Sequence, residues 1–134
     1  FEEFKEKAKV ILNGRDIGKY EKIMSSLEGT FEFVEGDVSV EKDCENILSF
    51  LKKQAKLDGL ICNVGSGSSV PPGQENSEEW ERVLKINFFS ATNLIEKCLP
   101  LLRESKGNIV CISSICGQAA LGAPLPTSGH VTSE

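Results

Sequence analysis

Residues 107–126 read Gly-Asn-Ile-Val-Cys-Ile-Ser-Ser-Ile-Cys-Gly-Gln-Ala-Ala-Leu-Gly-Ala-Pro-Leu-Pro, and they decide the fold of this 134-residue chain. The apolar run from Ile109 to Ile112 predicts a buried strand over residues 107–113, with Ser113 and Ser114 at its end. A loop marked by Gly and Pro follows. Open α/β proteins keep their ligand crevice at the carboxyl ends of the strands, so we expect the two serine hydroxyls to lie beside such a crevice.

Working outward from this strand, short apolar runs alternate with amphipathic stretches. The pattern predicts strands over 8–13, 31–35 and 60–62, helices over 17–27, 40–56 and 77–104, and a loop over 64–76. Asn76 or Ser77 is the expected cap of the last helix, and Pro100 is a position where that helix is expected to bend. Strands that alternate with helices indicate an α/β fold with a parallel sheet and right-handed crossovers.

Composition excludes several classes of function. The net charge is −5 and no run of Lys or Arg stands out, so we expect neither a nucleic-acid nor an anionic-membrane surface. No apolar stretch is long enough to span a membrane, and the first residues show no signal peptide.

Five cysteines are present without a Cys-x-x-Cys pair, and the single histidine is His130, so no metal site is expected. We expect small, buried hydrophobic roles for Cys44, Cys62, Cys98 and Cys111, in a reducing, cytoplasmic location. Cys116 lies in the candidate site loop.

Three further segments carry polar or glycine residues at strand ends or on a helix. Asn63-Val64-Gly65 follows a strand, Gly36-Asp37-Val38 follows another, and Asn87 lies on a mostly apolar helix stripe within Lys85-Ile86-Asn87-Phe88. Each also has an ordinary interpretation: a strand-to-loop turn, a cap of the next helix, and a structural amide bonded to backbone or water.

Together these segments resemble the short-chain dehydrogenase/reductase family, in its single-domain subgroup. The resemblance covers residues 1–126 and implies a partial NAD(P)-binding Rossmann domain, a doubly wound parallel sheet. The family's first strand, with its Gly-rich turn, and its C-terminal strands are absent from the 134 residues. The sheet would then have a gap beside the first predicted strand, which is implausible for a folded monomer, so we interpret the chain as a fragment. Residues 127–134 form a tail that does not match the family.

The resemblance also implies roles for individual residues. Ser114 would orient the substrate oxygen and Asn87 would hold a water of a proton relay. Asn63, Val64 and Gly65 would lie at the adenosine ribose, and Asp37 and Val38 at the adenine.

The cofactor would be NADP or NAD. A carboxylate at the end of the first predicted strand would favour NAD, whereas Asn13 stands there and Arg15 follows, which favours the 2′-phosphate of NADP. An ordinary surface pairing of Arg15 with Asp16 is the alternative.

One departure concerns catalysis. Where the family places a tyrosine and a lysine, this chain has Thr127 and Val131, and a threonine hydroxyl ionises too weakly to replace a phenol. We therefore interpret the chain as an incomplete NAD(P)-dependent oxidoreductase of the 1.1.1 class, inactive alone, whose parent acts on a carbonyl or secondary alcohol. The resemblance implies a dimer or tetramer of the intact protein. A non-catalytic nucleotide- or partner-binding module and a sugar-nucleotide epimerase or dehydratase are the alternatives.

Overall fold

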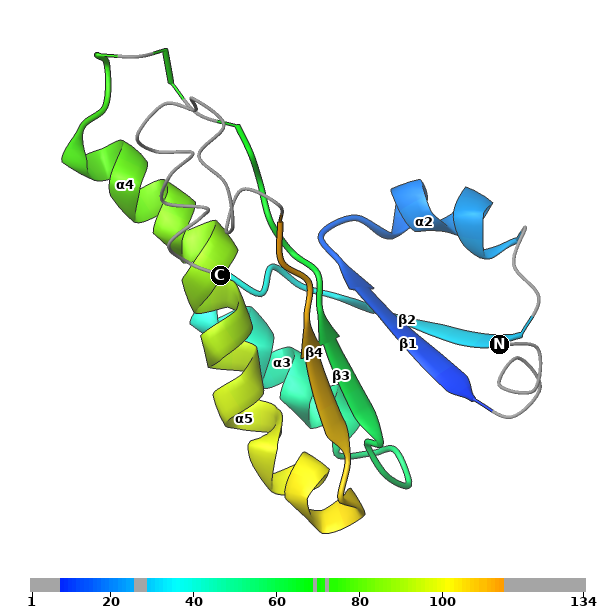
Figure 1. Ribbon diagram of the computed structural model, residues 1–134. Coiled ribbons are helices and arrows are strands. Elements are labelled where there is room, and N and C mark those ends of the chain that lie inside the picture. The colour runs from blue at the N-terminus through cyan, green and yellow to red at the C-terminus, as the bar shows by residue number, and fades with distance from the viewer. Residues whose placement is uncertain (1–7, 26–28, 69, 72, 115–134) are drawn as a thin grey trace.

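The computed structural model describes residues 8–25, 29–68, 70–71 and 73–114 (Figure 1). Strands and helices alternate along this part of the chain, which confirms the α/β class. In order they are β1 (Lys9–Gly14), α2 (Ile17–Met24), β2 (Thr30–Glu35), α3 (Glu41–Leu51), β3 (Gly59–Cys62), α4 (Ser77–Leu84), the π-helical η1 (Lys85–Phe89), α5 (Ser90–Ser105) and β4 (Asn108–Cys111).

The strands form two separate parallel pairs. β1 pairs with β2 from Lys9 opposite Thr30 to Gly14 opposite Glu35, and β3 pairs with β4 from Gly59 opposite Asn108 to Cys62 opposite Cys111. Among the described residues no strand joins the two pairs, and Figure 1 draws them apart. The parallel direction and the interrupted sheet both agree with the expectation from the sequence.

One hydrophobic cluster holds the two pairs together. α3 packs against β2 on one side and α5 on the other, while α5 also lies against β3 and β4. The apolar side chains of these elements are buried because the helical stripes at i, i+3 and i+4 face one another. The cluster consists of Val34, Val38, Cys44, Ile47, Leu51, Leu94, Cys98 and Leu102.

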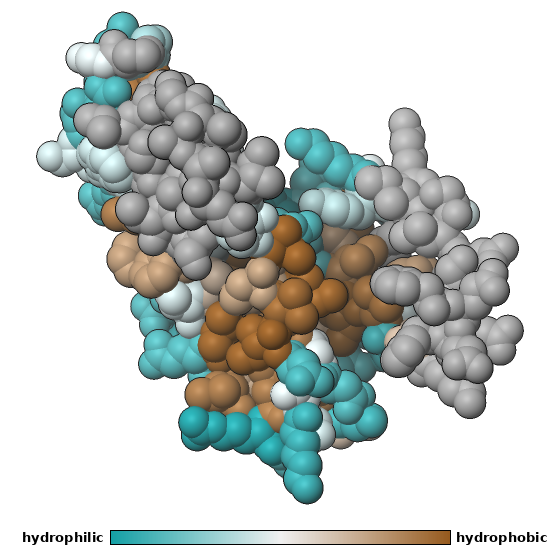
Figure 2. Space-filling view, in the orientation of Figure 1, coloured by the Kyte–Doolittle hydropathy of each residue, from teal (hydrophilic) through white to brown (hydrophobic). Residues whose placement is uncertain are grey.

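The expected burial of the 107–113 strand is wrong. β4 is shorter than predicted and its residues are exposed, with Val110 at 49 % and its partner Ile61 on β3 at 67 %. β3 is the one neighbouring strand that the described residues supply, and no described helix shields the face that carries Ile61 and Val110. Figure 2 shows the resulting apolar side chains gathered in the middle of the visible face.

Two predicted helices also differ from the structure. α3 ends at Leu51 rather than near residue 56, because the next amides bond three residues back, Lys53 to Phe50 and Gln54 to Leu51. The predicted helix over 77–104 contains a π-helical turn at Lys85–Phe89, while Pro100 stays inside α5. Asn76 is the N-cap, as expected, and accepts a hydrogen bond from the Glu79 amide at 2.9 Å.

The expectation for the cysteines holds for two of the four that are described. Cys44 and Cys98 are fully buried between α3 and α5, whereas Cys62 is half-buried and Cys111 is exposed. Within the described ranges, no helix has the length and apolar character needed to cross a membrane.

Candidate functional site

The carboxyl ends of β3 and β4 bring two predicted site segments to one edge. The Ile112 amide donates a hydrogen bond to the Cys62 carbonyl at 2.9 Å, which extends the pairing to the end of both strands. Asn63, Val64 and Gly65 then leave β3, and Ser113 and Ser114 leave β4, at the same edge because the strands are parallel. Asn63 and Val64 are exposed, and Ser114 is half-buried.

Asn87 ties the loop that follows β3 to the long helix. Its Oδ1 accepts a hydrogen bond from the Ser66 amide at 2.7 Å, and its Nδ2 donates to the Ser66 carbonyl at 3.0 Å. A side-chain amide has two donor and two acceptor positions, so each Asn87 group retains one for another partner. The structural interpretation of this residue is therefore correct, and it is compatible with a second bond to a water or ligand.

Asn87 lies in the middle of η1, a feature that the sequence analysis missed. A π-helical turn inserts an extra residue into the helix and interrupts the regular i to i−4 bonding, and such turns are frequent at functional sites. The Ser90 hydroxyl donates to the Ile86 carbonyl inside this segment. The sequence signal for this irregularity is weak: it is a serine within a predicted helix, a residue whose hydroxyl can bond to the carbonyl four residues back.

A second contact fixes the same loop from α4. The Arg82 guanidinium donates to the Ser68 carbonyl at 2.8 Å and to Glu79 through Nε at 2.9 Å. The hydrogen bond from Arg82 lowers the pKa of Glu79. Two side chains of the α4–η1 segment therefore anchor a loop whose Ser- and Gly-rich composition alone gave no sign of this.

The carboxyl ends of β1 and β2 carry the residues expected at the adenosine. Asn13 donates from Nδ2 to the carbonyls of Val34 and Gly36, each at 3.1 Å, and so joins the two strand ends. Arg15 follows β1 with its side chain 79 % exposed. Its Nη1 lies 3.9 Å from Oδ2 of Asp37.

Asp37 forms a local turn instead of capping α3. Its Oδ1 accepts from the Ser39 amide at 2.9 Å and from the Ser39 hydroxyl at 2.6 Å. The N-cap of α3 is Val40, without a side-chain cap, so the alternative interpretation of Asp37 as a helix cap is wrong. Burial alone would raise the pKa of Asp37, but the Ser39 hydrogen bonds, Arg15 and Lys85 together lower it and keep the carboxylate ionised.

Val38 is 4 % exposed and belongs to the hydrophobic cluster. Its side chain therefore serves the core, and only its backbone is available for a cofactor contact.

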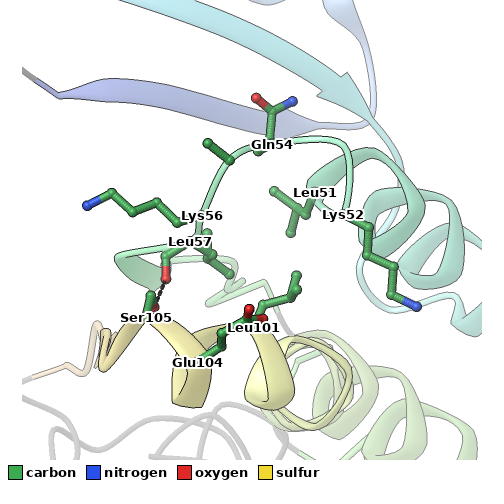
Figure 3. A pocket seen from close by; sticks show the side chains of 9 residues that line it. Leu51, Lys52, Gln54, Lys56, Leu57, Leu101, Glu104 and Ser105 are labelled. Atoms are coloured by element: carbon green, nitrogen blue, oxygen red, sulfur yellow. Dashed lines mark hydrogen bonds between the residues drawn. The ribbon is translucent and has the colours of Figure 1, made fainter.

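A cavity of about 410 Å³ lies away from these residues (Figure 3). Its lining includes Leu51, the last residue of α3, Gln54 just after that helix, Leu57 before β3, and Leu101 and Glu104 from the last turns of α5. Because Leu57 lies just before β3 begins, the cavity is at the amino edge of the strand, opposite the carboxyl edge that carries the candidate site. No residue from the sequence-based site lines it.

The comparison with sequence families decides the assignment. A profile described as short chain dehydrogenase matches residues 2–124. The chain belongs to the short-chain dehydrogenase family.

Individual relatives agree with this short-chain dehydrogenase assignment. An uncharacterised oxidoreductase of Schizosaccharomyces pombe is 34 % identical over 115 residues, covering 84 % of this chain and 46 % of the relative. L-fucose dehydrogenase of Mus musculus is 30 % identical over 132 residues, covering 93 % of this chain and 47 % of the enzyme. The chain thus spans about half the length of these two relatives.

Solved short-chain dehydrogenases share the arrangement of strands and helices. The structure of a short chain dehydrogenase from Mycobacterium smegmatis matches with a TM-score of 0.79 and 25 % identity, over 94 % of this chain and 54 % of that protein. The expected Rossmann-like fold, incomplete in these 134 residues, is confirmed. Thr127 and Val131, which we expect where the family places its tyrosine and lysine, lie outside the described residues, as does Cys116.

Proposed function

We propose that the chain is part of an NAD(P)-dependent oxidoreductase that acts on a carbonyl compound or a secondary alcohol. One observation carries the proposal: in a member of the short-chain dehydrogenase family, Ser114 and the Asn87-anchored loop lie at the same carboxyl edge of β3 and β4. Polar groups at this edge are where an open α/β sheet binds its ligand.

The residues fit the adenosine part of a dinucleotide by their chemistry. Arg15 offers an exposed guanidinium, Asp37 an ionised carboxylate, and Asn63 to Gly65 an exposed turn. When bound, a nicotinamide cofactor supplies or accepts the hydride. The chain's own residues would hold it: Asp37 and the backbone of Val38 at the adenine, and the turn from Asn63 through Val64 to Gly65 at the ribose.

We further propose that NADP is preferred over NAD. The side chain of Arg15 is largely in solvent and its contact with Asp37 is long, so the guanidinium can turn toward a 2′-phosphate at little energetic cost. At the other strand pair, the Ser114 hydroxyl would orient the substrate oxygen. The remaining donor and acceptor of the Asn87 amide would hold a water that passes protons.

Activity of the full-length protein tests the reaction class. We expect NADPH oxidation with a ketone or aldehyde, and Ser114→Ala to lower kcat/KM by about 10² or more, as loss of a group that acts on the reacting oxygen does. The matched control, Ser113→Ala, removes the neighbouring hydroxyl and should change kcat/KM much less. Cofactor binding without turnover on any carbonyl would favour the non-catalytic binding module instead.

Dissociation constants for the two cofactors test the preference. Arg15→Ala should weaken NADPH binding by roughly tenfold while leaving NADH binding nearly unchanged, because NADH lacks the 2′-phosphate. Lys19→Ala removes another exposed cation, on α2, and serves as the control. Equal loss of both cofactors in Arg15→Ala would contradict the preference for NADP.

We also propose that the intact protein is a dimer or tetramer formed through the α4–α5 segment. Light scattering of the full-length protein would test the assembly, and a monomeric mass would contradict it.

For the location, we propose a reducing, cytoplasmic compartment. The described cysteines are free thiols, which supports this proposal.

A further inference from the structure

Two cysteines stand directly opposite each other where β3 and β4 end. Cys62 and Cys111 are partners in the parallel register. Adjacent strands lie about 4.8 Å apart, which falls within the range of about 4.4–6.8 Å between the Cα atoms of a disulfide. Partners in register project to the same side of a sheet, so both thiols lie on one face.

The position of Cys62 identifies that face. Leu60, two residues earlier on β3, packs against the hydrophobic cluster, and Cys62 projects to the same side. The thiol of Cys98, on α5, is one of the groups that raise the pKa of Cys62, so Cys62 faces α5. The pair therefore lies on the side of β3 and β4 that α5 covers.

The two thiols differ in access. Cys111 is exposed and Cys62 is half-buried. A second pair of neighbouring thiols, Cys44 and Cys98, is fully buried between α3 and α5. Among the described cysteines, Cys111 is thus the thiol of these two pairs that a reagent in solution can reach, whereas Cys44 and Cys98 are both enclosed.

The chemistry of the pair suits thiol–disulfide exchange rather than metal binding. In the described part of the chain, no three His, Cys, Asp or Glu residues gather in a way that could hold a metal ion. Burial, followed by the neighbouring Cys111 thiol, raises the pKa of Cys62 to about 11. Cys62 is therefore a poor first nucleophile, whereas the exposed Cys111 is the point of entry.

We propose that Cys62 and Cys111 form a redox-active dithiol that a low-molecular-weight disulfide converts into a Cys62–Cys111 disulfide. The Cys111 thiolate attacks one sulfur of the small disulfide and releases one thiolate, which leaves a mixed disulfide. The Cys62 thiol then loses its proton, attacks Cys111 Sγ and expels the second thiolate. Two protein thiols are oxidised and one small disulfide is reduced to two thiols.

The position of this disulfide means that it would constrain the candidate site. Cys62 directly precedes Asn63, and Cys111 is separated from Ser113 by one residue. A covalent link at this point fixes the spacing between the strand end that leads to the Asn87-anchored loop and the strand end that leads to the two serines. The inference stands without the proposed oxidoreductase activity, because it concerns two thiols and not the reaction.

The experiment equilibrates the full-length protein, carrying Cys116→Ser, with mixtures of oxidised and reduced glutathione. Remaining thiols are blocked with iodoacetamide, and cross-linked peptides are identified by mass spectrometry. We expect the peptides of Cys62 and Cys111 to be joined with loss of two hydrogen atoms, at a yield about tenfold or more above any other pair. In guanidinium chloride, where the strand register is lost, this preference should disappear.

Variants in which one cysteine is replaced by alanine form the second part of the experiment. Cys62→Ala should stop at a glutathione adduct on Cys111, whereas Cys111→Ala should leave Cys62 largely unmodified. Cys98→Ala removes a thiol of the fully buried pair and should still form the Cys62–Cys111 link. The proposal is overturned if native protein yields no Cys62–Cys111 link, if the link forms equally in denaturant, or if Cys62→Ala leaves Cys111 unmodified.

Discussion

The side chain of Asn87 forms two hydrogen bonds with the backbone of a single residue, Ser66, which lies 21 positions earlier in the sequence. This contact joins the π-helical turn to the loop after β3. Asn87→Ala removes both bonds and leaves the half-buried backbone groups of Ser66 without this partner. We expect a loss of about 1–3 kcal/mol in the free energy of unfolding, measured by urea titration.

Asn87→Asp separates the two bonds, because a carboxylate still accepts from the Ser66 amide but cannot donate to its carbonyl. The charged oxygen that replaces Nδ2 faces the Ser66 carbonyl, so Asn87→Asp should also lose stability, although it keeps the bond from the Ser66 amide. Asn46→Ala, an exposed asparagine on α3, is the matched control and should stay within about 0.5 kcal/mol of the wild type. Equal stability of Asn87→Ala and Asn46→Ala would show that the Ser66 contact contributes nothing.

The turn between α5 and β4 contains a lysine in a backbone conformation that favours glycine, followed by a glycine whose position has no room for a side chain. Lys106 has a φ of 56°, in the left-handed region. Gly107 has no room for a side chain, since an added Cβ would lie 2.7 Å from the carbonyl oxygen of Asp58. We expect Lys106→Gly to raise the free energy of unfolding by roughly 1 kcal/mol and Gly107→Ala to lower it by about 1–3 kcal/mol, both measured by urea titration.

Gly67→Ala is the control for the second change, because nothing lies within 4 Å of its added Cβ. If Gly107→Ala and Gly67→Ala unfold at the same urea concentration, the close approach of Asp58 to Gly107 is not present in solution.

Asn76 caps α4 through its bond to the Glu79 amide. Asn76→Ala should cost about 1 kcal/mol, and Asn76→Asp should restore it, since aspartate accepts the same bond and its charge favours a helix N-terminus. Thermal unfolding followed by circular dichroism measures both. Ser77→Ala, at the exposed first helical position, is expected to have little effect; a drop as large as that of Asn76→Ala would reassign the cap.

Asp37 links stability to acid pH. Its pKa is lowered in the folded state, so its contribution is present above the unfolded-state pKa and is lost as the pH falls through the lower, folded-state value. Ser39→Ala removes the hydroxyl that donates to this carboxylate, so the folded-state pKa of Asp37 should move toward the unfolded-state value. The acid-dependent loss of stability should then be smaller and should be complete at a higher pH. Urea midpoints between about pH 3 and pH 6 test this.

Ser49→Ala, an exposed serine on α3, is the control for the acid titration. A profile for Ser39→Ala that matches both Ser49→Ala and the wild type would exclude the Ser39 hydroxyl as the cause of the lowered pKa of Asp37.

Much of the fold could be predicted because its signals are local. The apolar runs that became β1, β2 and β3, and the Asn76 cap, depend on neighbours within a few residues. The parallel direction followed from strands that alternate with helices, and a gap between β1 and β3 was what the family resemblance implied.

Features that depend on distant partners were not predictable in the same way. The exposure of Val110 is set by which elements lie beside β4, not by its own apolar character. The π-helical turn keeps nearly the same pattern of apolar residues as an α-helix, so periodicity did not reveal it. For Asn87, both a structural and a functional interpretation were compatible with the sequence, and only the three-dimensional contact with Ser66 established the structural one.

The hydrophobic cluster around α3 has a consequence for how the molecule unfolds. Within the described residues, β1–β2 and β3–β4 share no hydrogen-bonded strand, yet both pack, directly or through α5, on the same helix. Loss of α3 would remove the helix that packs on β2 and would also expose the face of α5 that α3 covers, so unfolding of one pair should weaken the other. The protein should consequently show a single cooperative transition, with fluorescence of Trp80 and far-ultraviolet dichroism changing together.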